Sequence, residues 1–136
     1  MTTQKIYESK YQRIFLDQSN AIMHNEWMED SIQMDEEDFK SELLHLVRCV
    51  AENPVERQLI DTLNFRFIVS PQLQAWTDVE VTKKNKMNGV KKVALIMPQE
   101  YITQLSVQQA LSEKEAKSLD TRFFSDMEEA KGWLLD

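Results

Sequence analysis

The sequence contains very little cysteine, glycine and histidine, and each scarcity excludes a class of function. The single cysteine, Cys49, allows no disulfide within the chain and indicates a reducing compartment, so we expect the cytoplasm. Two glycines leave no glycine-rich phosphate loop, and two histidines form no His-x-x-x-His metal pair. No nucleophile, base and oxyanion donors stand at a recognisable spacing. The sequence therefore predicts a protein that is not an enzyme and has no cofactor or metal site.

Positive charge and long apolar runs are also scarce. Among 136 residues, 16 Lys and Arg face 23 Asp and Glu, which gives a net charge of −7. This balance disfavours nucleic acid and anionic membrane surfaces as partners. No apolar run reaches the roughly 20 residues that span a bilayer, so membrane insertion is not expected. The expected partners are another protein, a second copy of the chain, or a small apolar molecule.

The first half of the chain predicts a β-hairpin followed by a helix. Apolar runs on both sides of the turn-forming segment Asp17–Asn20 indicate the hairpin, with or without a short extra strand before it. Asp35 and Asp38 resemble a helix cap, and the helix should end near Asn53. Its predicted apolar face comprises Phe39, Leu43, Leu46, Val47 and Val50. Glu42 and His45 fall on the opposite, polar side.

The second half of the chain alternates predicted strands and helices. The expected elements are a strand at 59–61, a helix at 71–86, a strand at 92–97, a helix from Tyr101, a strand at 120–124 and a last helix capped by Ser125 with Glu128. Such alternation predicts parallel strands beside the antiparallel hairpin. We therefore expect a single α/β domain over 1–136, whose mixed sheet has about four to five strands with helices packed on it.

The stretch Arg57–Trp76 contains the candidate functional residues. It is predicted to form an interior strand, a bent connection and a helix, and open α/β sheets bind ligands where such strands end. Arg66 could bind an anion or pair with an acidic neighbour, and pairing is favoured. Ser70 before Pro71 is interpreted as a helix cap rather than a phosphorylation site. The candidate partner or ligand surface comprises Asp61, Asn64, Arg66, Ser70 and Gln72.

This stretch resembles the key segment of the STAS domain, the fold of the sporulation anti-sigma factor antagonists. Leu59–Asp61 matches an apolar strand with its Asp, Phe67 and Ile68 match a Phe-Ile pair, and Ser70 matches the first of two serines. Further segments resemble the SpoIIAA-like (STAS/SEC14-like) group, which is bacterial and mostly of unknown function. These segments are Asp61–Phe65, Ser70–Trp76 and Phe124–Leu134.

The resemblance implies a STAS-like fold and a regulatory role through protein–protein interaction. The family is switched by phosphorylation of the second serine, where this chain has Pro71, and Val69 and Gln72 replace the flanking Asp and Gly. A phosphoserine switch is therefore not expected. The alternative function is the binding of a small apolar or lipid-like ligand in a pocket of roughly 300 Å³ or more. Its candidate lining residues are Met23, Trp27, Met34, Met87 and Met97.

Overall fold

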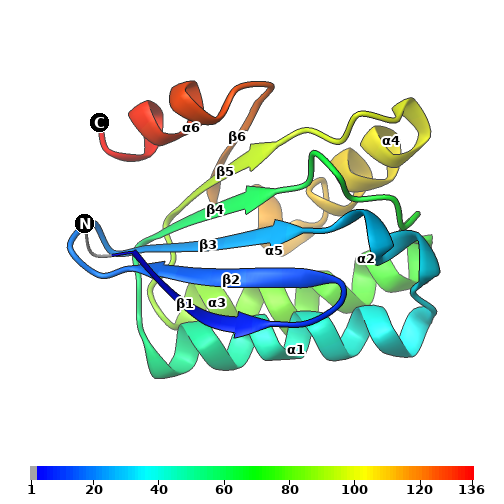
Figure 1. Ribbon diagram of the computed structural model, residues 1–136, viewed down its shortest axis with the longest axis horizontal. Coiled ribbons are helices and arrows are strands. Elements are labelled where there is room, and N and C mark those ends of the chain that lie inside the picture. The colour runs from blue at the N-terminus through cyan, green and yellow to red at the C-terminus, as the bar shows by residue number, and fades with distance from the viewer. Residues whose placement is uncertain (1–2) are drawn as a thin grey trace.

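The computed structural model describes residues 3–136 and contains one mixed sheet with strands in the order β1-β2-β3-β4-β5-β6 (Figure 1). The strands are β1 (Thr3–Glu8), β2 (Gln12–Asp17), β3 (Ile22–Trp27), β4 (Arg57–Asp61), β5 (Lys92–Ile96) and β6 (Asp120–Phe124). β1, β2 and β3 pair antiparallel, and β3 to β6 pair parallel. The predicted α/β class and the mixed sheet are therefore confirmed.

The strand count of six differs from the predicted four to five. The additional strand is β1, which pairs with β2 through a register shift between Lys5 and Tyr7. Its six residues include only two large apolar side chains, Ile6 and Tyr7, so its periodic signal is weak. Backbone pairing along β2, together with the packing of Ile6 and Tyr7 against the core, holds this edge strand in place.

Helical segments connect the parallel strands and cover both faces of the sheet. They are η1 (Glu29–Gln33, a 3₁₀ helix), α1 (Glu36–Glu52), α2 (Pro71–Thr77), η2 (Asp78–Thr82, a π-helix), α3 (Lys83–Met87), α4 (Tyr101–Ala110), α5 (Lys114–Lys117) and α6 (Met127–Leu134). Figure 1 shows α1 and α3 on one side of the sheet and α6 on the other. The larger core lies under α1, and a smaller core lies under α6.

Helix α1 begins and ends where the sequence predicts. The Asp35 carboxylate accepts the Asp38 N–H at 2.8 Å, and the Asp38 carboxylate accepts the Asp35 N–H at 3.1 Å, so the capping box is confirmed. The predicted polar face is wrong at two positions. Glu42 is only 6% exposed, and the His45 ring is half-buried and stacks on Tyr7 at a centroid distance of 4.5 Å.

The helical stretch after β4 runs from Pro71 to Met87, close to the predicted 71–86, but its central turn is a π-helix. A π turn adds a residue to a helical turn and often marks a functional region. The stretch ends before Gly89, whose φ of 111° lies in the left-handed region that glycine tolerates, as predicted.

The cap of α6 differs from the predicted Ser125. The Asp126 carboxylate accepts the Glu129 N–H at 3.0 Å, so the helix begins one residue later. Both Ser125-x-x-Glu128 and Asp126-x-x-Glu129 satisfy the same capping pattern, and the pattern alone does not separate them. This register places Ala130 and Leu134 in the small core.

His24 of β3 lies on the α6 side of the sheet and borders a pocket of about 200 Å³ beside Lys131. Burial lowers the pKa of His24 below its ordinary 6.5, more than the Asp61 carboxylate raises it, and Lys131 lowers it further. The unfolded state therefore binds more protons than the folded state below about pH 6.5, so the free energy of unfolding should fall as pH falls.

Urea unfolding at several pH values between about 5 and 7.5 measures this dependence. The variant His24→Gln should show a shallower loss of stability towards acid pH than the wild type. Met87→Gln, which changes an exposed residue without a titratable group, is the control and should retain the wild-type slope. Equal slopes for wild type and His24→Gln would contradict the prediction.

Candidate functional site

The candidate residues lie at the carboxyl end of β4, where the segment 62–70 crosses to α2. The Thr62 N–H and hydroxyl both donate to the Ile96 carbonyl at the end of β5, and the Gln99 N–H donates to the Leu63 carbonyl at 3.3 Å. Farther along, the Val69 N–H donates to the Ser106 hydroxyl of α4 at 3.3 Å. These bonds join segment 62–70 to the region where α4 begins, and we refer to this region as the carboxyl edge.

The structure gives several of the predicted site residues a local structural task. The Asp61 carboxylate accepts the Leu63 N–H at 3.1 Å and turns the chain out of β4. The Arg66 guanidinium pairs with the Glu100 carboxylate, so the favoured pairing interpretation is confirmed. Gln72 is exposed on the first turn of α2. Asn64 borders a different surface cleft, beside β1 and β2.

Ser70 caps α2, as the sequence predicts. Its hydroxyl accepts the Leu73 N–H at 3.2 Å, and Pro71 occupies the first turn, where it has no N–H to satisfy. Replacing Ser70 with alanine should lower the free energy of unfolding by about 1 kcal/mol in urea unfolding. Ser70→Asp retains a capping oxygen and should stay close to the wild type. A Ser70→Ala variant as stable as the wild type would contradict the capping role.

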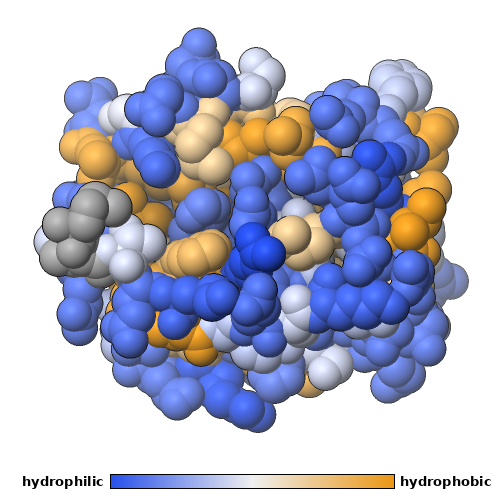
Figure 2. Space-filling model, in the orientation of Figure 1, coloured by the Kyte–Doolittle hydropathy of each residue, from blue (hydrophilic) through white to orange (hydrophobic). Residues whose placement is uncertain are grey.

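Five large apolar side chains are exposed at the carboxyl edge. We call this group the carboxyl-edge patch, and its members are Leu63, Ile68, Tyr101, Ile102 and Leu105. Their exposed fractions range from 37% to 69%. Figure 2 shows hydrophobic atoms at the right edge of the view, over the region where Figure 1 places α4 and the loop after β4. Exposed apolar groups of this kind mark interaction surfaces.

The sequence does not identify this patch. Helix α4 buries Thr103, Ser106 and Val107 and leaves Tyr101 and Leu105 exposed. The imperfect period of this helix was the available signal. Neighbouring residues of a helix diverge by about 100°, so the adjacent Tyr101 and Ile102 cannot both face the core squarely.

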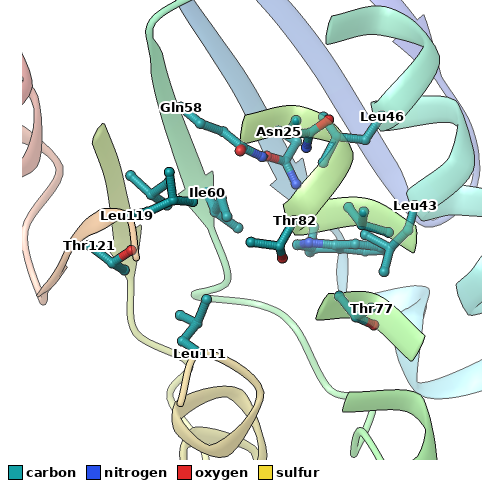
Figure 3. A pocket seen from close by; sticks show the side chains of 14 residues that line it. Asn25, Leu43, Leu46, Gln58, Ile60, Thr77, Thr82, Leu111, Leu119 and Thr121 are labelled. Atoms are coloured by element: carbon teal, nitrogen blue, oxygen red, sulfur yellow. The ribbon is translucent and has the colours of Figure 1, made fainter. Parts of the chain in front are cut away.

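A second feature is an interior cavity of about 90 Å³ between the sheet and the helices α1 and η2. Figure 3 shows side chains from β3, β4 and β6 on its sheet side and Thr77 and Thr82 on its helix side. The Gln58 Nε2 donates to Asn25 Oδ1 at 3.5 Å. The buried oxygens of Thr77, Asn85 and Thr121 have no hydrogen-bond partner. None of the 14 residues around the cavity is ionisable.

This cavity differs from the pocket that the lipid hypothesis requires. Its volume of about 90 Å³ lies below the roughly 300 Å³ of a ligand pocket for larger molecules. Of the five residues expected to line such a pocket, Trp27 alone borders the cavity. Met23 and Met34 pack in the core, and Met87 is 77% exposed. The cavity therefore gives the lipid alternative no support.

Three further observations concern metal binding, thiol reactivity and membrane crossing in the described residues. Within 3–136, no group of three His, Cys, Asp or Glu is placed to hold a metal ion. Burial raises the pKa of the Cys49 thiol, which disfavours the reactive thiolate. In the same range, no helix is long and apolar enough to cross a membrane.

Comparison with solved structures shows a protein of similar fold. No protein-family model matches the chain, and no curated protein matches it. The nuclease MPE of Pseudomonas putida is similar in structure, with a TM-score of 0.54, 17% sequence identity and coverage of 90% of this chain. The match covers 59% of the nuclease chain, so this chain spans less than two thirds of that protein. At this identity the likeness shows the fold alone.

The resemblance to the STAS domain and its SpoIIAA-like group is therefore wrong. No family model supports it, and the structural relative is a nuclease. The matching residues have simpler explanations in this structure. Leu59–Asp61 is a buried strand with a turn-forming Asp, Ser70 is a helix cap, and Phe67 packs against Phe39 at a centroid distance of 4.9 Å. Strand, cap and helix chemistry recurs in unrelated α/β proteins.

Proposed function

We propose that this chain is a non-enzymatic binding domain whose carboxyl-edge patch contacts a protein partner. The observation that supports this most is the exposure of five large apolar side chains on two adjoining segments, residues 62–70 and α4. Scattered exposed apolar residues are ordinary, whereas a contiguous group with a polar surround is typical of an interface. The net charge of −7 makes an anionic membrane a poor alternative occupant.

The patch has the composition and surroundings of a protein interface. Tyr101 is 69% exposed, and tyrosine is enriched among the residues that dominate binding energy. The Arg66–Glu100 ion pair supplies charge beside the apolar residues, as the rim of an interface does. Asp61, Ser70 and Gln72 of the candidate surface contribute polar groups to the same edge.

Segment 62–70 is held rigidly although it has no regular secondary structure. Phe65 is 4% exposed and packs on Trp27 at a centroid distance of 5.0 Å, and Phe67 packs on Phe39 at 4.9 Å. The Arg66 N–H donates to the Ser31 hydroxyl at 2.9 Å. A segment fixed before binding loses little conformational entropy when it meets a partner, which favours affinity.

The experiment compares the wild type with the double variant Ile68→Asp, Ile102→Asp. Both side chains are more than half exposed, so the folded state should tolerate the changes. Tagged wild type should retain a partner from lysate of its host, and the double variant should bind that partner at least about tenfold more weakly. Met87→Asp is the matched control, because Met87 is 77% exposed and lies at the opposite end of the sheet.

A second copy of the chain is the other protein partner to be tested. Sedimentation velocity over a concentration series should show a dimer for the wild type and Met87→Asp, and a monomer for the double variant, if the patch binds itself. The proposal fails if every retained protein binds the double variant as well as the wild type and the sedimentation coefficient is the same for all three proteins.

A further inference from the structure

The interior cavity presents two carboxamides with unused hydrogen-bonding capacity. Asn25 of β3 and Gln58 of β4 are 1% and 4% exposed and share one contact, from Gln58 Nε2 to Asn25 Oδ1 at 3.5 Å. This length is at the outer limit of a hydrogen bond. Their other polar atoms, Gln58 Oε1 and the Asn25 amide hydrogens, make no hydrogen bond with the described residues. Both amides line the cavity, so their remaining hydrogen-bonding capacity is available to a molecule bound there.

Further unpaired oxygens surround the same cavity. Thr77 and Asn85 belong to the helical wall and Thr121 to β6, and each has a buried side-chain oxygen without a partner. Asn85 is only 2% exposed. Of the five such atoms in residues 3–136, three therefore belong to residues that line this one cavity. The concentration at one place indicates a common cause.

The π turn shapes the helical wall. Val81 and Thr82 belong to η2, and Thr77 immediately precedes it. A regular α-helix would be one residue shorter over this turn and would set Asn85 at another angle about the helix axis. The π turn and the unpaired polar groups therefore coincide in the fold.

The lining determines the class of molecule that fits. No ionisable side chain borders the cavity, so a charged ligand would be desolvated without compensation. The volume of about 90 Å³ is smaller than the 150 Å³ cavity that accepts benzene. Gln58 Oε1 and Asn85 Oδ1 need a donor, whereas the Asn25 amide and the Thr121 hydroxyl can donate to an acceptor. A carboxamide group supplies both functions.

We propose that the cavity is a binding site for a small neutral carboxamide, held against Asn25 and Gln58. The ligand nitrogen donates to Gln58 Oε1, and the ligand carbonyl accepts from the Asn25 amide. The short alkyl end of the ligand lies against the apolar part of the lining. That part comprises Leu43, Leu46, Ile60, Val81, Leu111 and Leu119.

One side of the cavity has three half-buried lining residues. Leu111, Leu119 and Thr121 are half-buried lining residues on this side, and Figure 3 shows them together, away from Leu43 and Leu46. The buried Asp78 carboxylate fixes α5 to the π turn, because it accepts the N–H groups of Glu115 and Ala116 at 2.8 and 2.9 Å.

The test is a titration of the isotope-labelled protein with acetamide, followed by NMR. The side-chain amide signals of Asn25, Gln58 and Asn85 should shift in a saturable way. Acetate has nearly the same shape but carries a charge, and it should give no saturable shift at these signals. Gln58→Met keeps the length of the side chain and should weaken acetamide binding about tenfold, as the loss of a buried hydrogen bond does.

Gln104→Met is the matched control. Gln104 is half-buried on α4, donates to the Pro98 carbonyl at 2.7 Å and lies outside the cavity lining. This variant should bind acetamide as the wild type does. A crystal of the wild type soaked in acetamide should show its carboxamide at Asn25 and Gln58, and this measurement holds even if Gln58→Met fails to fold.

Three outcomes would overturn the proposal. NMR shifts that rise linearly with the acetamide concentration, for residues over the whole surface, would show that the protein has no specific site. Equal NMR shifts with acetamide and acetate would contradict the proposal, because the uncharged lining should reject the charged acetate. Density for water alone in the soaked crystal would show that the polar groups serve hydration and not a carboxamide.

Discussion

Replacing Glu42 with alanine should lower the free energy of unfolding by about 3 kcal/mol, a large part of the stability of a small domain. The carboxylate of Glu42 accepts hydrogen bonds from the Tyr7 hydroxyl at 3.1 Å, the Ser9 hydroxyl at 2.8 Å and Gln12 Nε2 at 3.2 Å. These donors belong to β1, β2 and the turn between them. Removing the acceptor leaves the half-buried hydroxyls of Tyr7 and Ser9 without this partner and removes one of the two hydrogen bonds of Gln12 Nε2, and urea unfolding measures the loss.

Within residues 3–136, the Glu42 carboxylate accepts hydrogen bonds from neutral groups and forms no ion pair, which is unusual for a buried carboxylate. Burial raises the pKa of the Tyr7 phenol, and the nearby Glu42 carboxylate raises it too, so Tyr7 remains a proton donor at neutral pH. Gln12 is fully buried and also donates to the Glu42 carbonyl at 2.7 Å. The network therefore fastens the β1–β2 hairpin to α1.

Two comparisons isolate the carboxylate. Glu42→Gln retains one acceptor oxygen and should cost about half as much as Glu42→Ala. Glu52→Ala changes an exposed glutamate of the same helix and should remain within about 0.5 kcal/mol of the wild type. A Glu42→Ala variant no less stable than Glu52→Ala would show that the network contributes nothing to folding.

Glu42 also shows where periodicity stops being informative. The apolar spacing of α1 predicts Phe39, Leu43, Leu46, Val47 and Val50; four of them are buried, and Val47 is half-buried. Glu42 lies at the margin of that stripe, where burial depends on what packs beside the helix. The hairpin at the start of the chain covers it, and that contact spans 30 or more positions of sequence. A pattern of neighbouring residues along the chain does not predict such a contact.

Strands and caps were predictable where one local force decides the structure. β5 is a continuous apolar run and lies between two parallel strands, and the capping chemistry of Asp35 and Ser70 is confirmed. The sequence left the presence of β1 open, because only two of its six residues are large and apolar and its periodic signal is therefore weak. The π turn was not predictable, since Asp78–Thr82 is compatible with an ordinary α-helix and tertiary packing widens it.

Some features of the candidate site can also be predicted from neighbouring residues, whereas others depend on the complete fold. The turn formed by Asp61 and the cap formed by Ser70 follow from neighbouring residues, so sequence reasoning reached them. The carboxyl-edge patch requires residues 62–70 and α4 to adjoin, and the cavity requires Asn25, Gln58 and Thr121 from three strands. Such groups arise only when the fold brings distant segments together. The family resemblance failed for a related reason, because it rested on local motifs that many folds share.

Replacing Phe39 with alanine should have the largest effect of the substitutions considered, about 4 kcal/mol in the free energy of unfolding. The Phe39 ring is 4% exposed and stacks on Trp27 and Phe67 at centroid distances of 6.3 and 4.9 Å, with Phe65 at 6.4 Å. Its removal leaves a void among three large rings that cannot all move inward. Leu44→Ala on the exposed side of the same helix is the control and should cost less than about 1 kcal/mol.

The same substitution connects the core to the proposed interface. Phe39 is the contact of α1 with Phe65 and Phe67, and these two rings fix the segment that presents Leu63 and Ile68. Amide hydrogen exchange of residues 62–70 should therefore accelerate in Phe39→Ala by more than global destabilisation accounts for, while the amides of β5 should follow the global change. Binding of the protein partner should also weaken in Phe39→Ala, because residues 62–70 must then become ordered when the partner binds. Unchanged exchange in residues 62–70, or a loss of stability equal to that of Leu44→Ala, would show that the aromatic cluster does not hold the carboxyl edge.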